Sequence, residues 1–525
     1  MKAAIRWVCV SDLHLGALNS LLTSVDPDGE RVDRSSVSPV LVALCEAVRS
    51  LRSGTDPPQL VVLGDLFELA LCSTEDAAAT FARFVVALGL GTADAAVAPG
   101  IRFVPGNHDH HLWSRARGDC YMEHIRGLAT TEPLPVEAHA TRLLPDNDPY
   151  PVRDRLIELL AARTDTRAAI TVELSYPNTG IVDATGRRAV VLSHGHFIEP
   201  LYRAMSTLEN FRQGRAPQRP SAGDLEAENG AWIDFFWSSM GDSGDMGRWA
   251  RTLYESLQSE AAIRAEIDAI RRAVSERSMS RFRSHVEGLL LDGGLSAAVE
   301  RSLRRERHEP ALLSENGQKG LQSYLSGPVA RQIDEEIGAP SEVAFVFGHT
   351  HKPFVDLGQP VALPGPGTVI NTGGWVVDTT APEPNKGASV IVIDEDLNIA
   401  ALRCFGQGSG SGHMIVVDGP PHDAANPLVS ELRTGIDPSR DPWRALAEAV
   451  TAVELERQDQ LRARLQAQTA ELGTPDDHHR WRRHRSGVGA PSASPSAPVS
   501  APGQGPAPAP APATGPAQAP ATGDR

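Results

Sequence analysis

The sequence predicts an α/β protein in which mixed sheets are flanked by helices, because short apolar runs alternate with helical stretches along the chain. The first helical stretches cover residues 39–51 and 75–88. The strand-like runs are 4–10, 59–63, 101–104, 168–176, 188–192, 342–347, 388–393 and 398–404. Three successive strand, turn and helix units are typical of parallel strands joined by crossover helices. Such strands end at the same edge of a sheet.

Five of these runs end in turns that carry carboxylate, imidazole or amide side chains. In chain order these turns are Ser11-Asp12-Leu13-His14, Gly64-Asp65, Gly106-Asn107-His108-Asp109, Ser193-His194-Gly195-His196 and Gly348-His349-Thr350-His351. Each turn alone has an ordinary explanation as a polar turn or a helix cap. Together, at the edge of a sheet where α/β proteins bind ligands, they predict one shared site.

The residue types in these turns indicate a metal site. Asp12 and His14 are two residues apart, a spacing that places both side chains on one face of an extended segment. Imidazole, carboxylate and amide ligands suit Mn²⁺, iron or Zn²⁺, and the absence of a thiolate argues against a structural zinc site.

Composition limits the class of protein. The chain has 525 residues and a formal net charge of −16, which disfavours a general nucleic-acid coat. Its five cysteines form no CxxC pair, so we expect neither a disulfide framework nor a zinc ribbon, and a cytoplasmic location. The N-terminal apolar run is too short for a signal peptide, and no apolar run is long enough for a spanning helix.

The pattern of apolar and polar residues divides the chain into a core domain, an insertion within it, a further helix and a tail. Residues 1–405 form the predicted core domain, and residues 197–340 form a helical insertion, or lid, within it. A further helix is predicted at 441–473. The tail at 474–525 is rich in proline and alanine and cannot bury enough apolar surface to offset the entropy of ordering, so we expect disorder.

In this combination and order, the five turns resemble the motifs of the calcineurin-like metallophosphoesterases. The resemblance covers residues 5–405 apart from the insertion. It implies an αββα sandwich and a catalytic domain with two divalent cations, manganese first, with iron or zinc as alternatives. One cation would be held by Asp12, His14 and His351, the other by Asn107, His194 and His349, and Asp65 would bridge the two.

The resemblance also implies a mechanism. Two cations about 3.5 to 4 Å apart can share a hydroxide that attacks phosphorus in line. His108 would stabilise the transition state or protonate the leaving oxygen. Glu68 stands where some branches of the family carry an acid that pairs with this histidine, and the alternative for Glu68 is a first-turn helix acid.

The predicted substrate is a small-molecule phosphoester, a phosphodiester or a pyrophosphate. Ser11-Asp12-Leu13-His14-Leu15 and Gly64-Asp65-Leu66-Phe67-Glu68 resemble the UDP-diacylglucosamine hydrolases, which typically carry arginine at the position of His108. A DNA-repair nuclease branch has similar motifs, but the position of the insertion and the acidic balance count against it. A third alternative is a protein-binding scaffold, although every ligand position is filled here by a competent residue.

Four further features are assigned as follows. His110 and His111 are expected to face solvent at a helix start, and His196 to line the pocket or bond a backbone carbonyl. The stretch from Asn371 to Trp375 is expected to support the site from behind. The aromatic run 232–237 is interpreted as core, with a substrate wall as the alternative.

Overall fold

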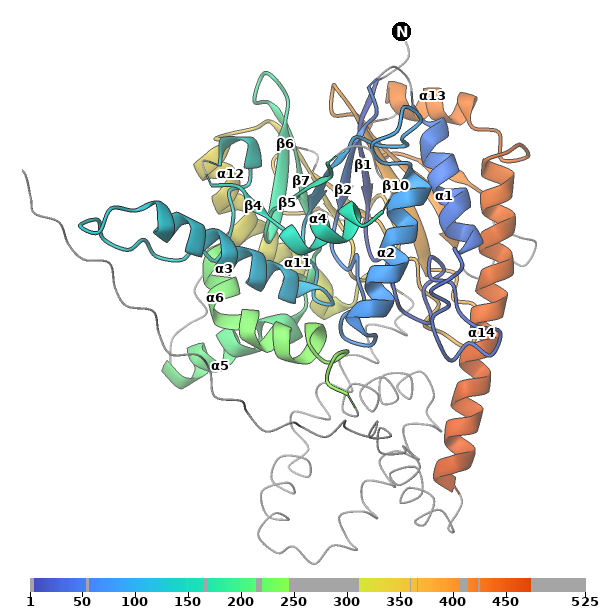
Figure 1. Cartoon of the computed structure of the whole chain (residues 1–525). Helices are drawn as coiled ribbons and strands as arrows, with labels where there is room; N and C mark the ends of the chain where they lie inside the picture. The colour runs from blue at the N-terminus through green and yellow to red at the C-terminus, as the bar shows by residue number, and fades with distance from the viewer. Residues whose placement is uncertain are drawn as a thin grey trace, which may run out of the picture. The chain divides into compact units, whose positions relative to one another are not determined.

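The computed structural model describes most of the chain as far as residue 473 (Figure 1). It covers residues 4–473 apart from 53–55, 149, 165–168, 214–219, 245–310, 359, 366, 407–413 and 424. The tail at 474–525, with its expected disorder, and residues 245–310 of the predicted helical insertion therefore lie outside the described residues.

The protein is α/β, with two mixed sheets flanked by helices, as the sequence predicts. The larger sheet has the strand order β12-β11-β10-β1-β2-β3-β5-β4 and the smaller one β6-β7-β8-β9. The strands of the larger sheet are β1 (Ile5–Val10), β2 (Gln59–Val62), β3 (Gly100–Phe103), β4 (Val152–Arg153), β5 (Thr171–Leu174), β10 (Gly387–Asp394), β11 (Ile399–Gly406) and β12 (Val416–Asp418). Those of the smaller sheet are β6 (Asn178–Val182), β7 (Arg188–Ser193), β8 (Glu342–Phe347) and β9 (Thr368–Asn371).

Strands β1, β2, β3 and β5 are parallel, and so are β7, β8 and β9. Two helices, α1 (Pro39–Ser50) and α2 (Thr74–Leu88), make the first two crossovers. Both begin at serine caps, because Ser38 and Ser73 accept hydrogen bonds from the backbone N–H groups of the first turn. The predicted units are confirmed, and the polar turns after β1, β2 and β3 lie at one edge of the sheet.

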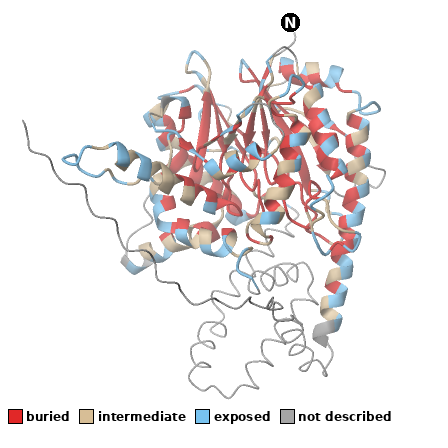
Figure 2. Ribbon diagram, viewed as in Figure 1, coloured by how far each residue is buried: buried red, intermediate tan, exposed pale blue. Residues whose placement is uncertain are grey.

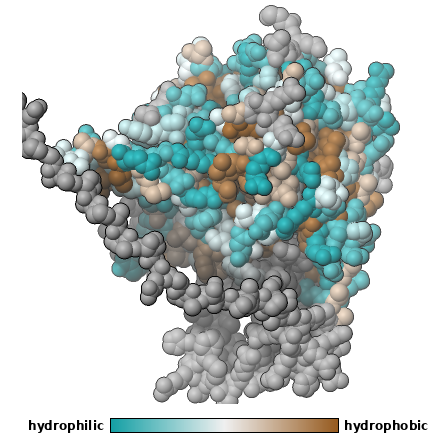
Figure 3. Space-filling model, viewed as in Figure 1, coloured by the Kyte–Doolittle hydropathy of each residue, from teal (hydrophilic) through white to brown (hydrophobic). Residues whose placement is uncertain are grey.

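The two sheets share a hydrophobic core. Strand β1 alternates, since Cys9 belongs to the cluster shared with the smaller sheet and Val8 and Val10 pack toward the helical side. Strand β8 alternates in the same way, with Val346 in the shared cluster. The strands of both sheets are accordingly buried, and the helices expose their outer faces (Figure 2). On the face shown in Figure 3, hydrophilic and apolar residues are intermixed.

The described elements between residues 197 and 340 are helical. Helix α3 (His110–Gly127) precedes this region and α4 (Arg155–Ala162) lies beside α2. The insertion contains η2 (His196–Ile198), η3 (Pro200–Arg203), α5 (Ala204–Gln213), α6 (Ala222–Ile233), the π-helix η4 (Asp234–Ser238), α11 (Glu315–Tyr324), the π-helix η5 (Leu325–Val329) and α12 (Ala330–Glu336).

Two segments differ from the sequence expectation. The sequence of residues 177–180, Pro-Asn-Thr-Gly, predicts a turn between the runs 168–176 and 188–192, but β6 begins at Asn178 and pairs with β7. The polar side chain of Asn178 is tolerated in the interior because it donates to Gln332 and accepts from Tyr324. The larger sheet also continues past residue 405, where the end of the core domain was expected, because β12 pairs with β11.

The C-terminal helices pack on the core domain. Helix α13 (Pro427–Gly435) contacts β11 and β12, and α14 (Trp443–Gly473) runs along α1 (Figure 1). Apolar residues of α14 such as Leu446 and Val450 are fully buried in the main core. Arg457 on the same helix is 4% exposed, and its Nη2 donates to the backbone carbonyl of Thr23 at 2.8 Å.

Within the described residues, no helix is both long and apolar enough to cross a membrane. All five cysteines are free thiols, as expected from their spacing.

We predict that Arg457→Ala lowers the free energy of unfolding by about 1 to 3 kcal/mol, because it leaves the buried Thr23 carbonyl without its donor. Urea unfolding followed by circular dichroism measures the change. Arg444→Ala is the matched control, since this arginine is half exposed on the same helix and forms only surface ion pairs. Equal losses in the two variants would contradict the role given to Arg457.

Candidate metal centre

The five polar turns follow β1, β2, β3, β7 and β8, and the structure brings their side chains together. Backbone hydrogen bonds fix the turns to one another, with Asp12 N–H donating to the Gly64 carbonyl at 3.0 Å and His14 N–H to the Asp65 carbonyl at 2.8 Å. The smaller sheet is tied in by Gly348 N–H, which donates to a backbone carbonyl of the turn after β7.

The first set of donor atoms comes from Asp12, His14 and His351, with Asp65 beside them. The Nε2 atoms of His14 and His351 lie 3.4 Å apart, and His351 Nε2 lies 3.4 Å from Asp12 Oδ1. Asp65 Oδ2 is 3.7 Å from His14 Nε2. Asp12, His14 and Asp65 are all buried.

The second set comes from Asn107, His194 and His349, and it adjoins the first at Asp65. His194 Nε2 lies 3.0 Å from Asn107 Oδ1 and 3.2 Å from His349 Nδ1. The same Asp65 Oδ2 that faces the first set lies 3.4 Å from His194 Nε2. All seven predicted ligands therefore lie in two adjoining sets with one carboxylate oxygen between them.

The donor spacing fits cation binding. Nitrogen and oxygen ligands bind first-row cations at about 2.0 to 2.2 Å, which places neighbouring ligand atoms about 3 to 3.5 Å apart. The separations between the candidate donor atoms are 3.0 to 3.4 Å, apart from the 3.7 Å between Asp65 and His14. Nitrogen atoms also face nitrogen atoms, an arrangement that needs a proton or a cation between the lone pairs. These buried groups could thus hold metal ions.

Each of the four histidines has a partner at the ring nitrogen that points away from the donor set. Such outer partners fix the tautomer and the orientation of ligand imidazoles. The contacts join His14 Nδ1 to Glu68 Oε2 (2.8 Å), His194 Nδ1 to the Leu63 carbonyl (2.9 Å), His349 Nε2 to Glu199 Oε1 (3.2 Å) and His351 Nδ1 to Asp378 Oδ2 (3.6 Å).

Glu68 serves two histidines at once. Its Oε2 contacts His14, and its Oε1 lies 2.7 Å from Nδ1 of His108. The His108 ring packs edge-on to His14 at 4.9 Å, and its backbone N–H donates to Asp65 Oδ1 at 2.8 Å. Glu68 is 3% exposed and precedes α2, so the alternative of a first-turn helix acid is wrong.

Backbone strain is concentrated at the same place. Among the described non-glycine residues, positive φ angles occur at Asp12 (50°), His14 (45°), Asp65 (48°), His349 (69°), His351 (57°) and Leu397 (61°). Each such residue costs of order 1 to 3 kcal/mol and persists only where the surroundings hold it. Five of the six are candidate ligands, and this observation is independent of any motif.

Glycines in the turns allow this close packing. A Cβ atom on Gly106 would lie 2.2 Å from Asp65 Oδ1, and one on Gly348 would lie 2.2 Å from Asp12 Oδ2. Any larger residue at these two positions would displace a candidate ligand.

Burial controls the charge of the site. Burial, together with the charges of Asp109 and Asp12, raises the pKa of Asp65 well above its ordinary value. Burial also lowers the pKa of His194 to about 3 and lowers that of His14. These two imidazoles are therefore neutral near pH 7, the form in which histidine binds metals.

Asp109 does not cap helix α3 with its side chain. Its carboxylate instead accepts from the N–H groups of Gly106 and Phe67, joining the turns after β3 and β2. Burial raises the pKa of this carboxyl to about 7.

The expectation for His110 is wrong, because this residue is fully buried. Its Nε2 lies 3.0 Å from Glu226 on α6 and its Nδ1 lies 2.5 Å from Asp234 on η4. Burial lowers its pKa, but the charge of Glu226 and the bond to Asp234 outweigh burial and raise it to about 10. Helix α3 is thereby joined to the insertion, whereas His111 is exposed as expected.

Nε2 of His196 lies 3.0 Å from the hydroxyl of Tyr176 rather than near a backbone carbonyl, and its ring lies 5.4 Å from that of His194. Asn371 supports the site as predicted: its amide donates to the Gly348 carbonyl at 2.7 Å. Trp375 is fully buried, and its N–H donates to the Asp12 carbonyl at 3.0 Å.

The aromatic run 232–237 is only partly core. Ile233 is buried, but Phe235 and Phe236 are 63% and 44% exposed. The rings of Trp237 and Tyr202 lie 5.1 Å apart, and Tyr202 lies 5.1 Å from the ring of His349.

Sequence reasoning missed Glu199 and Asp378, which contact the outer nitrogens of His349 and His351. Glu199 follows Phe197 and Ile198, and Asp378 follows the apolar run 375–377, so each had the same local signal as the other site residues, a carboxylate at the end of an apolar stretch.

Comparisons with family models, curated proteins and solved structures gave no match. The interpretation of the site therefore rests on its residues and their geometry.

Proposed function

We propose that the protein is a metal-dependent phosphoesterase that hydrolyses a phosphodiester or a pyrophosphate of a small molecule. The observation that carries this proposal is the pair of adjoining donor sets that share Asp65 Oδ2, with the His108 imidazole beside them. The order of the motifs supports membership of the calcineurin-like metallophosphoesterases, and with it an αββα sandwich.

The proposed cofactors are two divalent cations, manganese first, with iron or zinc as alternatives. Asp12, His14 and His351 would hold one of them, Asn107, His194 and His349 the other, and Asp65 would contact both. When bound, such a pair would supply a water of lowered pKa and neutralise charge on the phosphoryl oxygens.

The chain itself supplies the proton for the leaving group. In this proposal, Glu68 accepts a hydrogen bond from Nδ1–H of His108, which leaves Nε2 to face the substrate. Burial opposes the charge of Glu68, but the nearby His108 and His14 outweigh it and lower its pKa below the ordinary value. His108 is thereby placed to pass a proton to the leaving oxygen.

The two alternative functions, a DNA nuclease and a protein-binding scaffold, have less support. A nuclease needs a basic surface to bind the phosphate backbone, and the formal net charge of this chain is −16. A scaffold that has lost catalysis has no need of strained backbone at five ligand positions.

We predict that the purified protein hydrolyses bis-p-nitrophenyl phosphate in the presence of Mn²⁺, and that Asp65→Ala and His349→Ala each reduce the rate to background. Release of p-nitrophenol measures the rate. His111→Ala is the matched control, because this histidine is exposed, and it should retain activity. Equal rates for wild type and both site variants under Mn²⁺, Fe²⁺ and Zn²⁺ would support the scaffold instead.

Glu68→Gln should lower metal affinity or activity about 10- to 100-fold, because an amide offers one acceptor oxygen where two imidazole N–H groups need one each. Calorimetric titration with Mn²⁺ and the rate with bis-p-nitrophenyl phosphate measure the two effects. Glu75→Gln, at an exposed position in the first turn of α2, is the control. Wild-type affinity and rate in Glu68→Gln would show that Glu68 does not position the histidines.

A further inference from the structure

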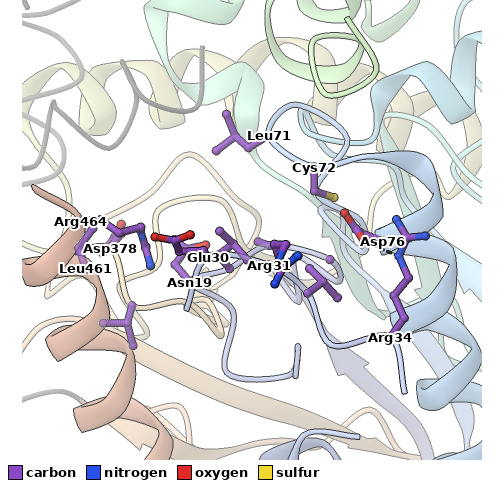
Figure 4. Close-up of a pocket in the computed structure, with 15 residues that line it drawn as sticks. Asn19, Glu30, Arg31, Arg34, Leu71, Cys72, Asp76, Asp378, Leu461 and Arg464 are labelled. Carbon is purple, nitrogen blue, oxygen red and sulfur yellow. Dashed lines mark hydrogen bonds and ion pairs between the residues drawn. The ribbon is translucent and has the colours of Figure 1, made fainter. Parts of the chain in front are cut away.

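A cavity of about 280 Å³ has Asp378 in its wall (Figure 4). Three of the loops that carry site residues contribute to its wall, through Gly16, Cys72 and Asp378. Asp378 also contacts Nδ1 of the candidate ligand His351 at 3.6 Å. One end of the cavity is therefore a single side chain away from the first donor set.

Two arginines lie away from that end. In Figure 4, Asp378 and Arg464 are at one side, Arg34 and Asp76 at the other, and Arg31 between them. Both Arg31 and Arg34 are held through Nε, by Asp26 at 3.3 Å and by Asp76 at 2.7 Å.

This arrangement leaves the terminal guanidinium nitrogens of Arg31 and Arg34 without a hydrogen bond to any described residue. A guanidinium fixed at Nε presents its two Nη groups as a fork that matches a phosphate or a carboxylate. Three acids line the cavity. Asp76 already pairs with Arg34, and Asp378 pairs with Lys386 at 3.2 Å. Among the described residues, Glu30 forms no ion pair with either arginine.

The rest of the cavity wall is partly apolar, with Leu71, Val32 and Leu461 among its members. Leu461 belongs to α14, and that helix also supports the loop that carries Arg31. Arg464 donates to the Gly29 carbonyl at 3.0 Å, and a Cβ atom on Gly29 would collide with the Gln460 side chain. The C-terminal helix thus completes a cavity that the core domain alone leaves open.

We propose that this cavity binds the organic part of the substrate, and that this part carries a second anionic group held by Arg31 and Arg34. The inference rests on the proposed function, since it places the bond to be hydrolysed at the Asp378 end. The ligand class is an organic phosphoester with a compact apolar body and a phosphate or carboxylate away from the reacting phosphorus.

The test measures binding to the full-length protein after removal of metals with EDTA, so that it does not depend on hydrolysis. The probe is phenyl phosphate, which joins an apolar ring to one anion, and calorimetry gives its dissociation constant. We expect wild type to bind phenyl phosphate more tightly than inorganic phosphate. Arg34→Ala should weaken binding of phenyl phosphate about tenfold, and Leu461→Trp should abolish it by filling the cavity.

Arg440→Ala is the control, since this exposed arginine precedes α14 and, among the described residues, forms an ion pair with Asp437 alone. Arg34 is exposed, so its variant keeps the test valid even if Leu461→Trp does not fold. The inference is overturned if wild type does not bind phenyl phosphate, or if Arg34→Ala binds it as wild type does. Hydrolysis of bis-p-nitrophenyl phosphate by a protein that fails this test would leave the proposed function intact and remove only the cavity's role.

Discussion

The carboxylate of Asp65 is the group on which the arrangement of the site depends. It is 1% exposed, and one of its oxygens faces both donor sets while the other accepts the N–H of His108. A buried carboxylate is costly unless opposite charge or hydrogen bonds surround it. Asp12 and Glu68 add negative charge nearby, so the stable condition of this pocket requires either protons or cations among the imidazoles. The fold therefore places buried negative charge where the five turns meet, and this charge must be balanced by protons or cations at that point.

Bringing the five turns together strains their backbone, and the surrounding sheets hold the turns in this strained conformation. Five candidate ligands adopt positive φ angles, and each turn is anchored by backbone hydrogen bonds to a neighbouring turn. The shared core between the sheets makes the strand ends rigid enough to hold this strain. Carboxylates on more distant elements then orient the rings, with Glu199 at the start of the insertion and Asp378 after β9. Each of the four candidate ligand histidines therefore has a contact at the ring nitrogen that points away from the donor atoms, and such contacts orient the imidazoles.

Strand ends could be predicted from the sequence because they depend on local pattern. Apolar runs ending in Asp12, Asp65 and Asn107 identify both the parallel strands and the residues at their edge. The burial of His110 could not be predicted, because its partners Glu226 and Asp234 are more than a hundred residues away and lie in the insertion. Strand β6 was missed for a similar reason. Its Asn178 is typical of a turn until Gln332 and Tyr324, both distant in sequence, satisfy its amide.

The strand ends and the elements packed around them have different roles, because they lie at different distances from the donor atoms. Strand ends supply the donor atoms, because only a sheet edge can bring five separate turns within hydrogen-bonding distance. A strand end has little room left to recognise the rest of a ligand, and that surface must come from elements packed around the edge. The loop before α1 that contains Thr23 and Gly29 and the helix α14 are packed there, and Arg457 and Arg464 attach the helix to the loop through these two backbone carbonyls. If the proposed cavity binds the substrate, changes in this loop and helix would alter which molecule is selected while the donor sets stay in place, since among the described residues no donor atom comes from either element.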